Sequence, residues 1–184
     1  NMFSGADALS DGAKCAIHTS FSSNENWPYD WSDLCYSYPF QTTEELQTAV
    51  DMWVDDHTTA LDTYGLIRYW DVSLITDMSN LFQEYTDFND DISSWDVSSV
   101  TNMADMFDRA TSFNGDISSW DVSGVTYMVH MFNGANALSD ENKCAIHTAF
   151  SSHDNWQYDW SDLCYSHPFQ TTEELQTAVD MWVD

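Results

Sequence analysis

The chain has 184 residues, of which 43% are hydrophobic and 15% aromatic, so it can bury a core instead of remaining disordered. Four Lys and Arg residues face 31 Asp and Glu residues, which gives a net charge of −27. This charge argues against nucleic acids and anionic membrane surfaces as partners, because both are bound through basic patches. No apolar run approaches the roughly 20 residues of a membrane span, so none is predicted in this segment.

Two parts of the chain repeat each other at an offset of 129 residues. Residues 6–55 align with residues 135–184 without gaps and differ at eight of fifty positions. Met2 and Phe3 likewise correspond to Met131 and Phe132, which end a periodic segment. We therefore interpret the chain as a window of a longer tandem array of 129-residue units, with residues 1–9 ending a preceding turn.

Residues 10–40 are predicted to form a cysteine-bearing linker or cap module, which residues 139–169 repeat. Each copy has two cysteines spaced by twenty residues, at equivalent positions: Cys15 and Cys35, then Cys144 and Cys164. A disulfide in each module would stabilise a small, loop-rich structure by about 3 kcal/mol and would indicate a location outside the cytoplasm. The second module is expected to begin with a helix that includes Ile146 and Phe150.

A structural zinc site is the alternative for these cysteines. Cys144 and His147, followed by Cys164 and His167, imitate the ligand spacing of such a site. The first module has Tyr38 in place of the fourth ligand. A repeated zinc site should not lose a ligand while the rest stays nearly unchanged, so disulfides are favoured.

Three aromatic residues, Trp27, Tyr29 and Trp31, precede Cys35 in the first module. They have two interpretations, a platform on which sugars stack or a small aromatic core. Their position beside Cys35, with Pro28 stiffening the loop, favours the small core.

Residues 41–65 are predicted to form a helical lid. Thr42 and Glu45 have the spacing of a capping box, and a second helical stretch ends at Gly65. Apolar residues follow the capping box at helical spacing: Leu46, Ala49, Val50 and Trp53. By the long repeat, residues 170–184 should begin the next lid.

Residues 66–138 contain three turns of a 25-residue period, each with the sequence W-D-V-S. In each turn, alternation around Trp95 and its equivalents predicts a short strand. Thr101 is expected to cap a short helix, and Asn114-Gly115 to form the return turn. The predicted fold class is α/β, a leucine-rich-repeat-like solenoid of short parallel strands about 4.8 Å apart with short helices. The predicted repeat core comprises Ile67, Trp70, Val72, Met78, Phe82, Ile92, Trp95, Val97, Met103, Phe107, Ile117, Trp120, Val122, Met128 and Phe132.

The strand face opposite the core is a candidate binding face. It carries Asp71, Ser73, Asp96, Ser98, Asp121 and Ser123. Carboxylates stacked at this distance would repel each other by about 1 kcal/mol even in water. Local backbone hydrogen bonds of the Asx type are favoured over a bound cation as the compensation.

Asp87, Asn89 and Asp91 form D-x-N-x-D, the beginning of a calcium loop. Ile92 replaces the expected glycine, and Ser98 replaces the twelfth-position glutamate. No metal or other cofactor is therefore predicted, and calcium remains an alternative at these three residues.

The 25-residue turns resemble the BspA-like surface-protein repeats, which also occur in mycoplasma lipoproteins. Residues 92–117 carry the long pattern W-D-V-S-x-V-T-x-M-x-x-M-F, followed by F-N-x-D-I-S. The resemblance implies a secreted or cell-surface protein with a leucine-rich-repeat-like fold and a role in adhesion or surface structure. It implies no enzyme activity. The 129-residue unit with its cysteine module departs from the usual pattern.

Two functions are compatible with these observations. The first is an extracellular structural protein whose neighbouring copies assemble into a surface rod or filament. The second is a cell-surface adhesin whose strand face binds a protein, a glycan or a mineral. The six histidines have no nucleophile or paired carboxylate at useful spacing, so the chain is not predicted to be an enzyme.

Overall fold

The computed structural model describes residues 9–165 apart from residues 25, 28 and 36. The predicted next lid at 170–184, residues 1–8 of the predicted preceding turn, Pro28 and His167 lie outside the described residues. Within the described part the chain forms four α-helices: α1 (Asp11–Phe21), α2 (Thr43–Asp55), α3 (His57–Tyr64) and α4 (Asp140–Phe150). Three short 3-10 helices accompany them: η2 (Ser32–Leu34), η3 (Ile67–Tyr69) and η4 (Ser161–Tyr165).

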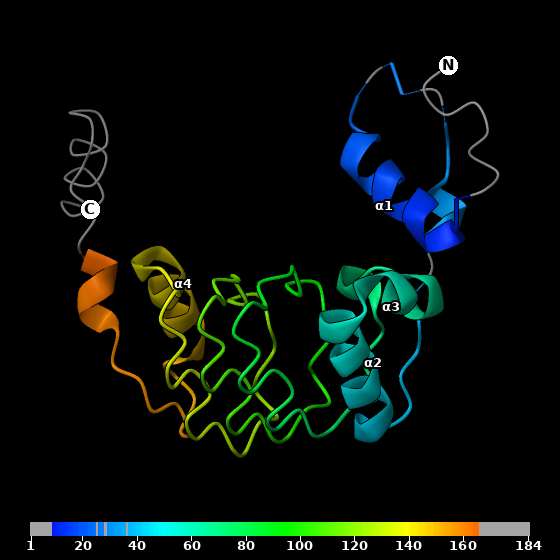
Figure 1. Ribbon diagram of the computed structural model, residues 1–184. Coiled ribbons are helices and arrows are strands. Elements are labelled where there is room, and N and C mark those ends of the chain that lie inside the picture. Colours follow the sequence, from blue (N-terminus) through cyan, green and yellow to red (C-terminus); the bar gives the residue numbers. More distant parts are fainter. Residues whose placement is uncertain (1–8, 25, 28, 36, 166–184) are drawn as a thin grey trace, which may run out of the picture.

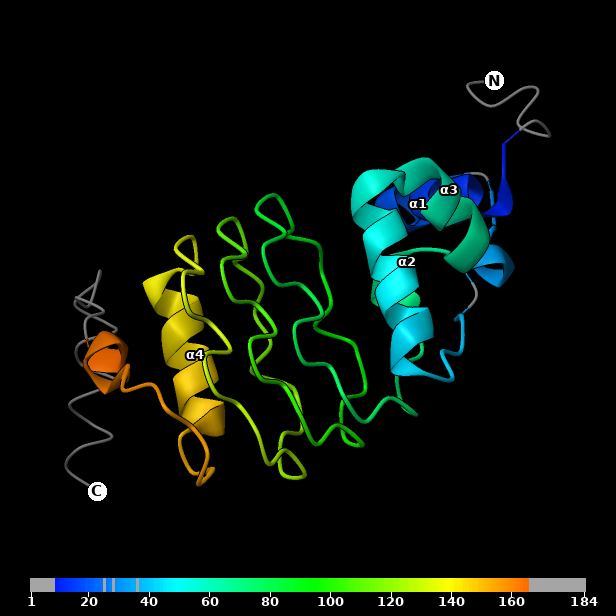
Figure 2. The ribbon, with the colours of Figure 1, turned by 60° about the horizontal axis from the view of Figure 1, so that its bottom comes forward.

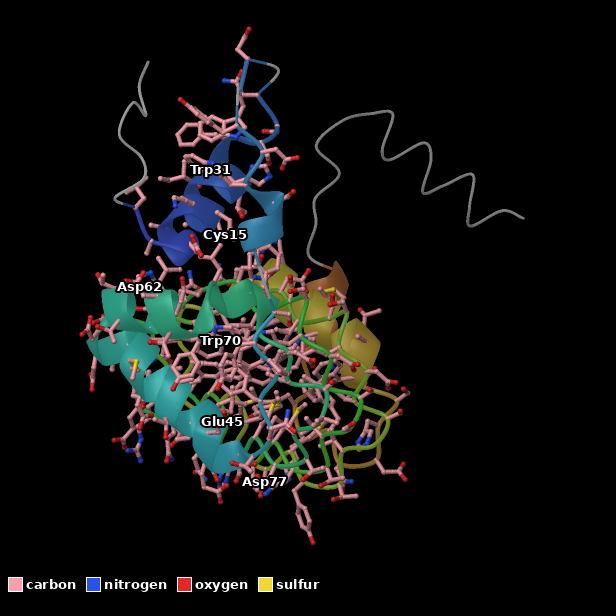
Figure 3. The ribbon with its side chains drawn as sticks, turned by 90° about the vertical axis from the view of Figure 1, so that its right-hand side faces the viewer. Cys15, Trp31, Glu45, Asp62, Trp70 and Asp77 are labelled. Carbon is pink, nitrogen blue, oxygen red and sulfur yellow. A yellow bond between two sulfur atoms is a disulfide. The ribbon has the colours of Figure 1, made fainter. Side chains whose placement is uncertain are left out.

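Three turns of chain lie side by side in the middle of the molecule, between α2 and α3 at one end and α4 at the other (Figures 1 and 2). We call them coil 1 (66–90), coil 2 (91–115) and coil 3 (116–138), and together the coil stack. In the first cysteine module (residues 10–40), α1 and η2 lie beyond α3 (Figure 1), whereas residues 38–40 pair with coil 1, where the N–H of Phe40 donates to the carbonyl of Asp71 at 3.0 Å. Trp70 lies inside the coil stack, whereas Cys15 and Trp31 lie in this outer module (Figure 3).

Backbone hydrogen bonds join each coil to the next at an offset of 24 residues. The N–H of Met78 donates to the carbonyl of Asn102, and the N–H of Met103 donates to the carbonyl of Tyr127, both at 2.8 Å. The same bond recurs at every second residue: Asn80 to Ala104, Phe82 to Met106, Glu84 to Asp108, Asp105 to Val129, Phe107 to Met131 and Arg109 to Asn133. Along this segment the N–H groups point toward the following coil, so its outer groups are carbonyls on coil 1 and N–H groups on coil 3. Elsewhere the direction is reversed, since the N–H of Thr101 donates to Thr76 and that of Thr126 donates to Thr101.

The predicted solenoid of parallel strands, and with it the α/β fold class and the leucine-rich-repeat likeness, is wrong. The described residues contain no strand and no sheet, and their only β-type pairings are isolated parallel bridges: Pro39 with Asp71, Asp77 with Asn102, and Asn102 with Tyr127. The physical reason lies in the bonds within each coil. The N–H of Trp95 donates to Ile92 at 3.1 Å and that of Val100 donates to Val97 at 2.8 Å, so turns interrupt the extended backbone. The described chain is helical at its ends and irregular in the middle.

The short helix expected after Thr101 is also absent. Its N–H groups at Met103, Asp105 and Phe107 donate to coil 3 instead of to carbonyls one helical turn back. Asp105 has a φ of 57° and Arg109 a φ of 58°, and this left-handed conformation interrupts a right-handed helix. The Thr101 hydroxyl donates to the carbonyl of Thr76 in coil 1 and caps no helix.

Aromatic side chains stack from coil to coil in the core. The ring of Phe107 lies 5.4 Å from Phe82 and 5.6 Å from Phe132, and both pairs are within 6° of parallel. Trp70 and Trp95 stack at 6.3 Å. All fifteen residues of the predicted repeat core are buried. The 25-residue period therefore aligns equivalent side chains even though the backbone between them is not a strand.

The helical lid covers the carbonyl end of the coil stack. As predicted, the Thr42 hydroxyl caps α2 by accepting from the N–H of Glu45, and the four apolar residues of its inner face are buried. Thr43 donates to the carbonyl of Asp77 at 2.8 Å and Gln47 to the carbonyl of Leu81 at 3.3 Å. These side chains replace the N–H donors of a preceding coil. The second lid helix, α3, ends at Gly65, whose φ of 74° suits glycine.

Candidate functional site

The three aspartates of the candidate binding face each occupy an Asx turn. Asp96 accepts from the N–H of Ser98 at 3.1 Å and from its hydroxyl at 2.6 Å. Asp71 accepts from both groups of Ser73 in the same way, and Asp121 accepts from the N–H of Ser123 at 3.0 Å. The local compensation favoured from the sequence is thus present. Coil stacking brings the six residues into one row.

Hydrogen bonding favours the anionic form of Asp96 and Asp121. The bond from the Ser98 hydroxyl lowers the pKa of Asp96, although the nearby charge of Asp121 opposes the shift. The Ser123 hydroxyl similarly lowers the pKa of Asp121. Both carboxylates are therefore ionised at neutral pH. A ligand of this face would have to present cationic groups or hydrogen-bond donors.

The row runs from one cysteine module to the other and has a groove at each end. A groove of about 490 Å³ lies beside Asp121 and Ser123, and the chain that follows α4 forms its other wall. At the opposite end a groove of about 320 Å³ lies beside Asp71 and Asp96 and includes Arg68. The candidate binding face is thus bounded by both modules.

Two of the three calcium candidates, Asn89 and Asp91, contact a neighbouring coil, whereas Asp87 is exposed. Asn89 accepts from the N–H of Asn114 at 2.6 Å. Asp91 accepts from Ser93 at 2.7 Å and pairs with Arg68 at 3.2 Å. In the part of the chain that the structure describes, no group of three or more His, Cys, Asp or Glu side chains could hold a metal ion.

Both cysteine pairs form disulfides, Cys15 with Cys35 and Cys144 with Cys164. Their Cα atoms lie 5.0 and 4.9 Å apart, within the ordinary range. A disulfide leaves no thiolate to bind zinc, and this decides against the zinc alternative for the four cysteines.

The second cysteine module (residues 139–169) covers the N–H end of the coil stack. Trp156, Tyr158 and Trp160 surround the ring of Phe132, with centroid distances of 6.2, 5.8 and 5.6 Å. The Tyr158 hydroxyl accepts from the N–H of Phe132 at 2.8 Å. This hydroxyl replaces the carbonyl acceptor that a further coil would supply.

The corresponding aromatic residues of the first module form a cluster. The ring of Trp27 lies 5.3 Å from that of Tyr29 and 5.7 Å from that of Trp31, and Tyr29 stacks on Trp31 at 5.0 Å. The three rings pack on one another but are half-buried, so the small aromatic core favoured from the sequence stays a prediction.

Two structurally important polar residues are absent from the sequence-based predictions. One is Tyr158, whose hydroxyl covers coil 3. The other is Asp108, which is 4% exposed and accepts from Gln83 of coil 1 at 3.0 Å and from Asn133 of coil 3 at 2.6 Å. The 25-residue spacing of Gln83, Asp108 and Asn133 is a signal that could have revealed this column, because its members are all polar.

We expect Asp108→Ala to lower the free energy of unfolding by about 2 kcal/mol at pH 7, because it removes charge-assisted bonds and leaves the two amides without their acceptor. Hydrogen bonds from Gln83 and Asn133, with the charge of Arg109, lower the pKa of Asp108 in the folded state. Its contribution is thus complete above the unfolded pKa of about 3.9 and is lost as the pH falls through the folded value. Urea titrations at pH 7 and pH 3 measure this. Exposed Asp87→Ala is the control, and an equal loss at both pH values would contradict the prediction.

A family model described as "Mycoplasma protein of unknown function, DUF285" matches residues 54–182. The chain belongs to the DUF285 family. The DUF285 match extends from the end of α2 through the coil stack and the second cysteine module, so it includes the candidate binding face. No curated protein and no solved structure matches the chain. Among the described residues, no helix has the length and apolar character needed to cross a membrane.

Proposed function

We propose that the chain is part of an extracellular structural protein in which 129-residue units follow one another and form a surface rod or filament. The observation that carries this proposal is that both ends of the coil stack are covered by elements of the repeated sequence. The α2 segment occurs in the 6–55 copy, and the second cysteine module occurs in the 135–184 copy. A unit that covers its own ends can be repeated in series without exposing apolar surface.

Two further features support a location outside the cell, and a third affects how neighbouring rods would pack. Disulfides persist in oxidising compartments. The 25-residue turns resemble the BspA-like surface-protein repeats. The net charge of −27 would oppose lateral association of neighbouring rods, and salt or divalent cations would modulate that repulsion. The proposed role involves no catalysis and no cofactor.

The row of Asp and Ser residues favours a second candidate function, that of an adhesin. Asp96, Ser98, Asp121 and Ser123 are exposed, and a groove lies at each end of the row. Such a face would bind a basic protein surface, a glycan or a mineral through carboxylates and hydroxyls.

Electron microscopy of the intact native protein distinguishes the two functions. A structural array should appear as a rod with a regular axial repeat, one density for each coil stack. An adhesin should appear as isolated stalks whose ends contact the partner. Images in which no axial repeat is present would overturn the array.

A further inference from the structure

The two cysteine modules have nearly the same sequence but different neighbours. Ile146 and Phe150 of α4 are completely buried, as part of the core that includes coil 3. Their equivalents in α1 are Ile17, which is half-buried, and Phe21, which is 48% exposed. Ile17 and Phe21 are four residues apart and therefore lie on one face of α1. The same apolar face thus covers a coil in one module and is open in the other.

The opposite side of α1 has a contact of its own. Gly12 packs so closely against the backbone carbonyl of Leu61 in α3 that an added Cβ would overlap with it, and the Ser10 hydroxyl donates to Asp62. Gly12 and Phe21 are nine residues apart, which places them on opposite sides of a helix with about 3.6 residues per turn. One module can therefore contact a coil through the Ile17 and Phe21 face and contact α3 through Gly12 at the same time.

We propose that the Ile17 and Phe21 face of the first cysteine module binds the third coil of a preceding 129-residue unit, as the second module binds coil 3. This inference rests on the proposed tandem array and names the contact by which its units are joined. Each module is then a two-sided joint. One side covers the N–H end of one coil stack, and the other packs on α3 of the next lid.

The contact between the second module and coil 3 indicates that the partner of the Ile17 and Phe21 face is also a third coil. The aromatic triad that surrounds Phe132 in the second module is repeated without change in the first. The residues ahead of the first module also have the sequence of a third coil, since Met2, Phe3 and Leu9 match Met131, Phe132 and Leu138. A partner of unrelated sequence would have to reproduce both an aromatic ring and a backbone N–H at its edge.

Two of the eight sequence differences lie on these contacts and make the joints unequal. Asn142 donates to the carbonyl of Asn114 at 2.7 Å and to its side chain at 3.0 Å, and Ala13 at the equivalent position cannot. Asn114 belongs to coil 2, so the first module should bind the preceding coil stack with two hydrogen bonds fewer. Glu141 stands at the position of Gly12, so the second module cannot approach a following α3 as closely as the first does.

The test compares Phe21→Ala with Phe150→Ala in two proteins, the 184-residue chain and the same chain preceded by one complete 129-residue unit. In the shorter chain Phe150→Ala should lower Tm by roughly 5–15 °C, and Phe21→Ala should change it little. In the extended chain Phe21→Ala should lower Tm of the preceding coil stack by a similar amount. Val54→Ala, at a position 39% exposed on α2, is the matched control and should be neutral in both.

Hydrogen exchange provides a second measurement that does not depend on a single unfolding transition. Protection of the α1 amides around Phe21 should rise to that of the α4 amides around Phe150 when the preceding unit is added. If Phe21→Ala stays neutral and α1 protection stays unchanged in the extended chain, the joint is overturned. The array itself is judged separately by the axial repeat in images of the native protein, so the two proposals can fail independently.

Discussion

Replacing Trp95 with Ala should lower the free energy of unfolding by about 3–5 kcal/mol. The side chain is 3% exposed and packs against two rings of coil 1, Trp70 at 6.3 Å and Phe82 at 5.8 Å. Its indole N–H donates to the carbonyl of Ile67 at 2.8 Å, across the boundary between coil 1 and coil 2. The substitution removes a large apolar volume and one of the two donors to that carbonyl, which keeps the N–H of Trp70 at 3.1 Å. Urea denaturation followed by far-UV circular dichroism measures the loss.

Two further variants complete the test: one separates the hydrogen bond of Trp95 from its buried volume, and the other is an exposed control. Trp95→Phe keeps much of the apolar volume but removes the hydrogen bond, so we expect a loss intermediate between those of wild type and Trp95→Ala. Leu74→Ala changes a residue of coil 1 that is 60% exposed, and it should have little effect. If Trp95→Ala were no more damaging than Leu74→Ala, the coils would not be held together by their stacked indoles.

The repeat period accounts for the part of the fold that sequence could predict. Residues 25 apart are buried in columns, because equivalent side chains in adjacent turns must meet when the turns stack. The α2 helix could be predicted because Thr42 and four apolar residues at helical spacing are local signals. The α4 helix likewise follows from a pattern within a single module, whereas the disulfides are favoured by comparing the two modules, because Tyr38 replaces one zinc ligand.

The backbone of the coils could not be predicted in the same way. Trp95 and Val97 are buried while Asp96 is exposed, which is the alternation of a strand. The same alternation arises here in a backbone bent by turns. Asp105 and Arg109 have positive φ values, yet neither is a glycine that would signal a left-handed conformation. Side-chain pattern specifies which face is buried, and it leaves open where the N–H groups point.

The residues of the candidate site also differ in whether they could be predicted from the sequence. The row of Asp71, Asp96 and Asp121 follows directly from the period. Asp108 and its partners also share the 25-residue period, so the polar column could have been found in the same way. Tyr158 contacts Phe132 from outside the periodic segment, and no pattern in the sequence marks that contact. The two modules also cannot be distinguished by sequence pattern alone. Their different neighbours appear only when exposure at Phe21 is compared with that at Phe150.

The second disulfide should matter more to the coil stack than the first. Replacing Cys144 and Cys164 together with Ser should lower the free energy of unfolding by about 3 kcal/mol, because a loop of twenty residues is no longer closed. That loop carries Tyr158 and the two tryptophans that surround Phe132. Its release would expose the N–H end of the stack to water. We expect faster hydrogen exchange in coil 3 and earlier proteolysis within residues 151–163.

The matched control is the double substitution of Cys15 and Cys35, which removes the equivalent loop closure from the first module. That module contacts α3, where Gly12 packs on Leu61, and coil 1, where Pro39 pairs with Asp71, whereas coil 3 lies at the other end of the stack. Its loss should loosen the first module and leave hydrogen exchange in coil 2 and coil 3 unchanged. If both double variants altered coil 3 equally, the second module would not be what covers it, and the two-sided joint would lose its physical basis. If only the Cys144 and Cys164 double variant changes hydrogen exchange in coil 3, the Cys144–Cys164 disulfide is what keeps the second module in place over that coil.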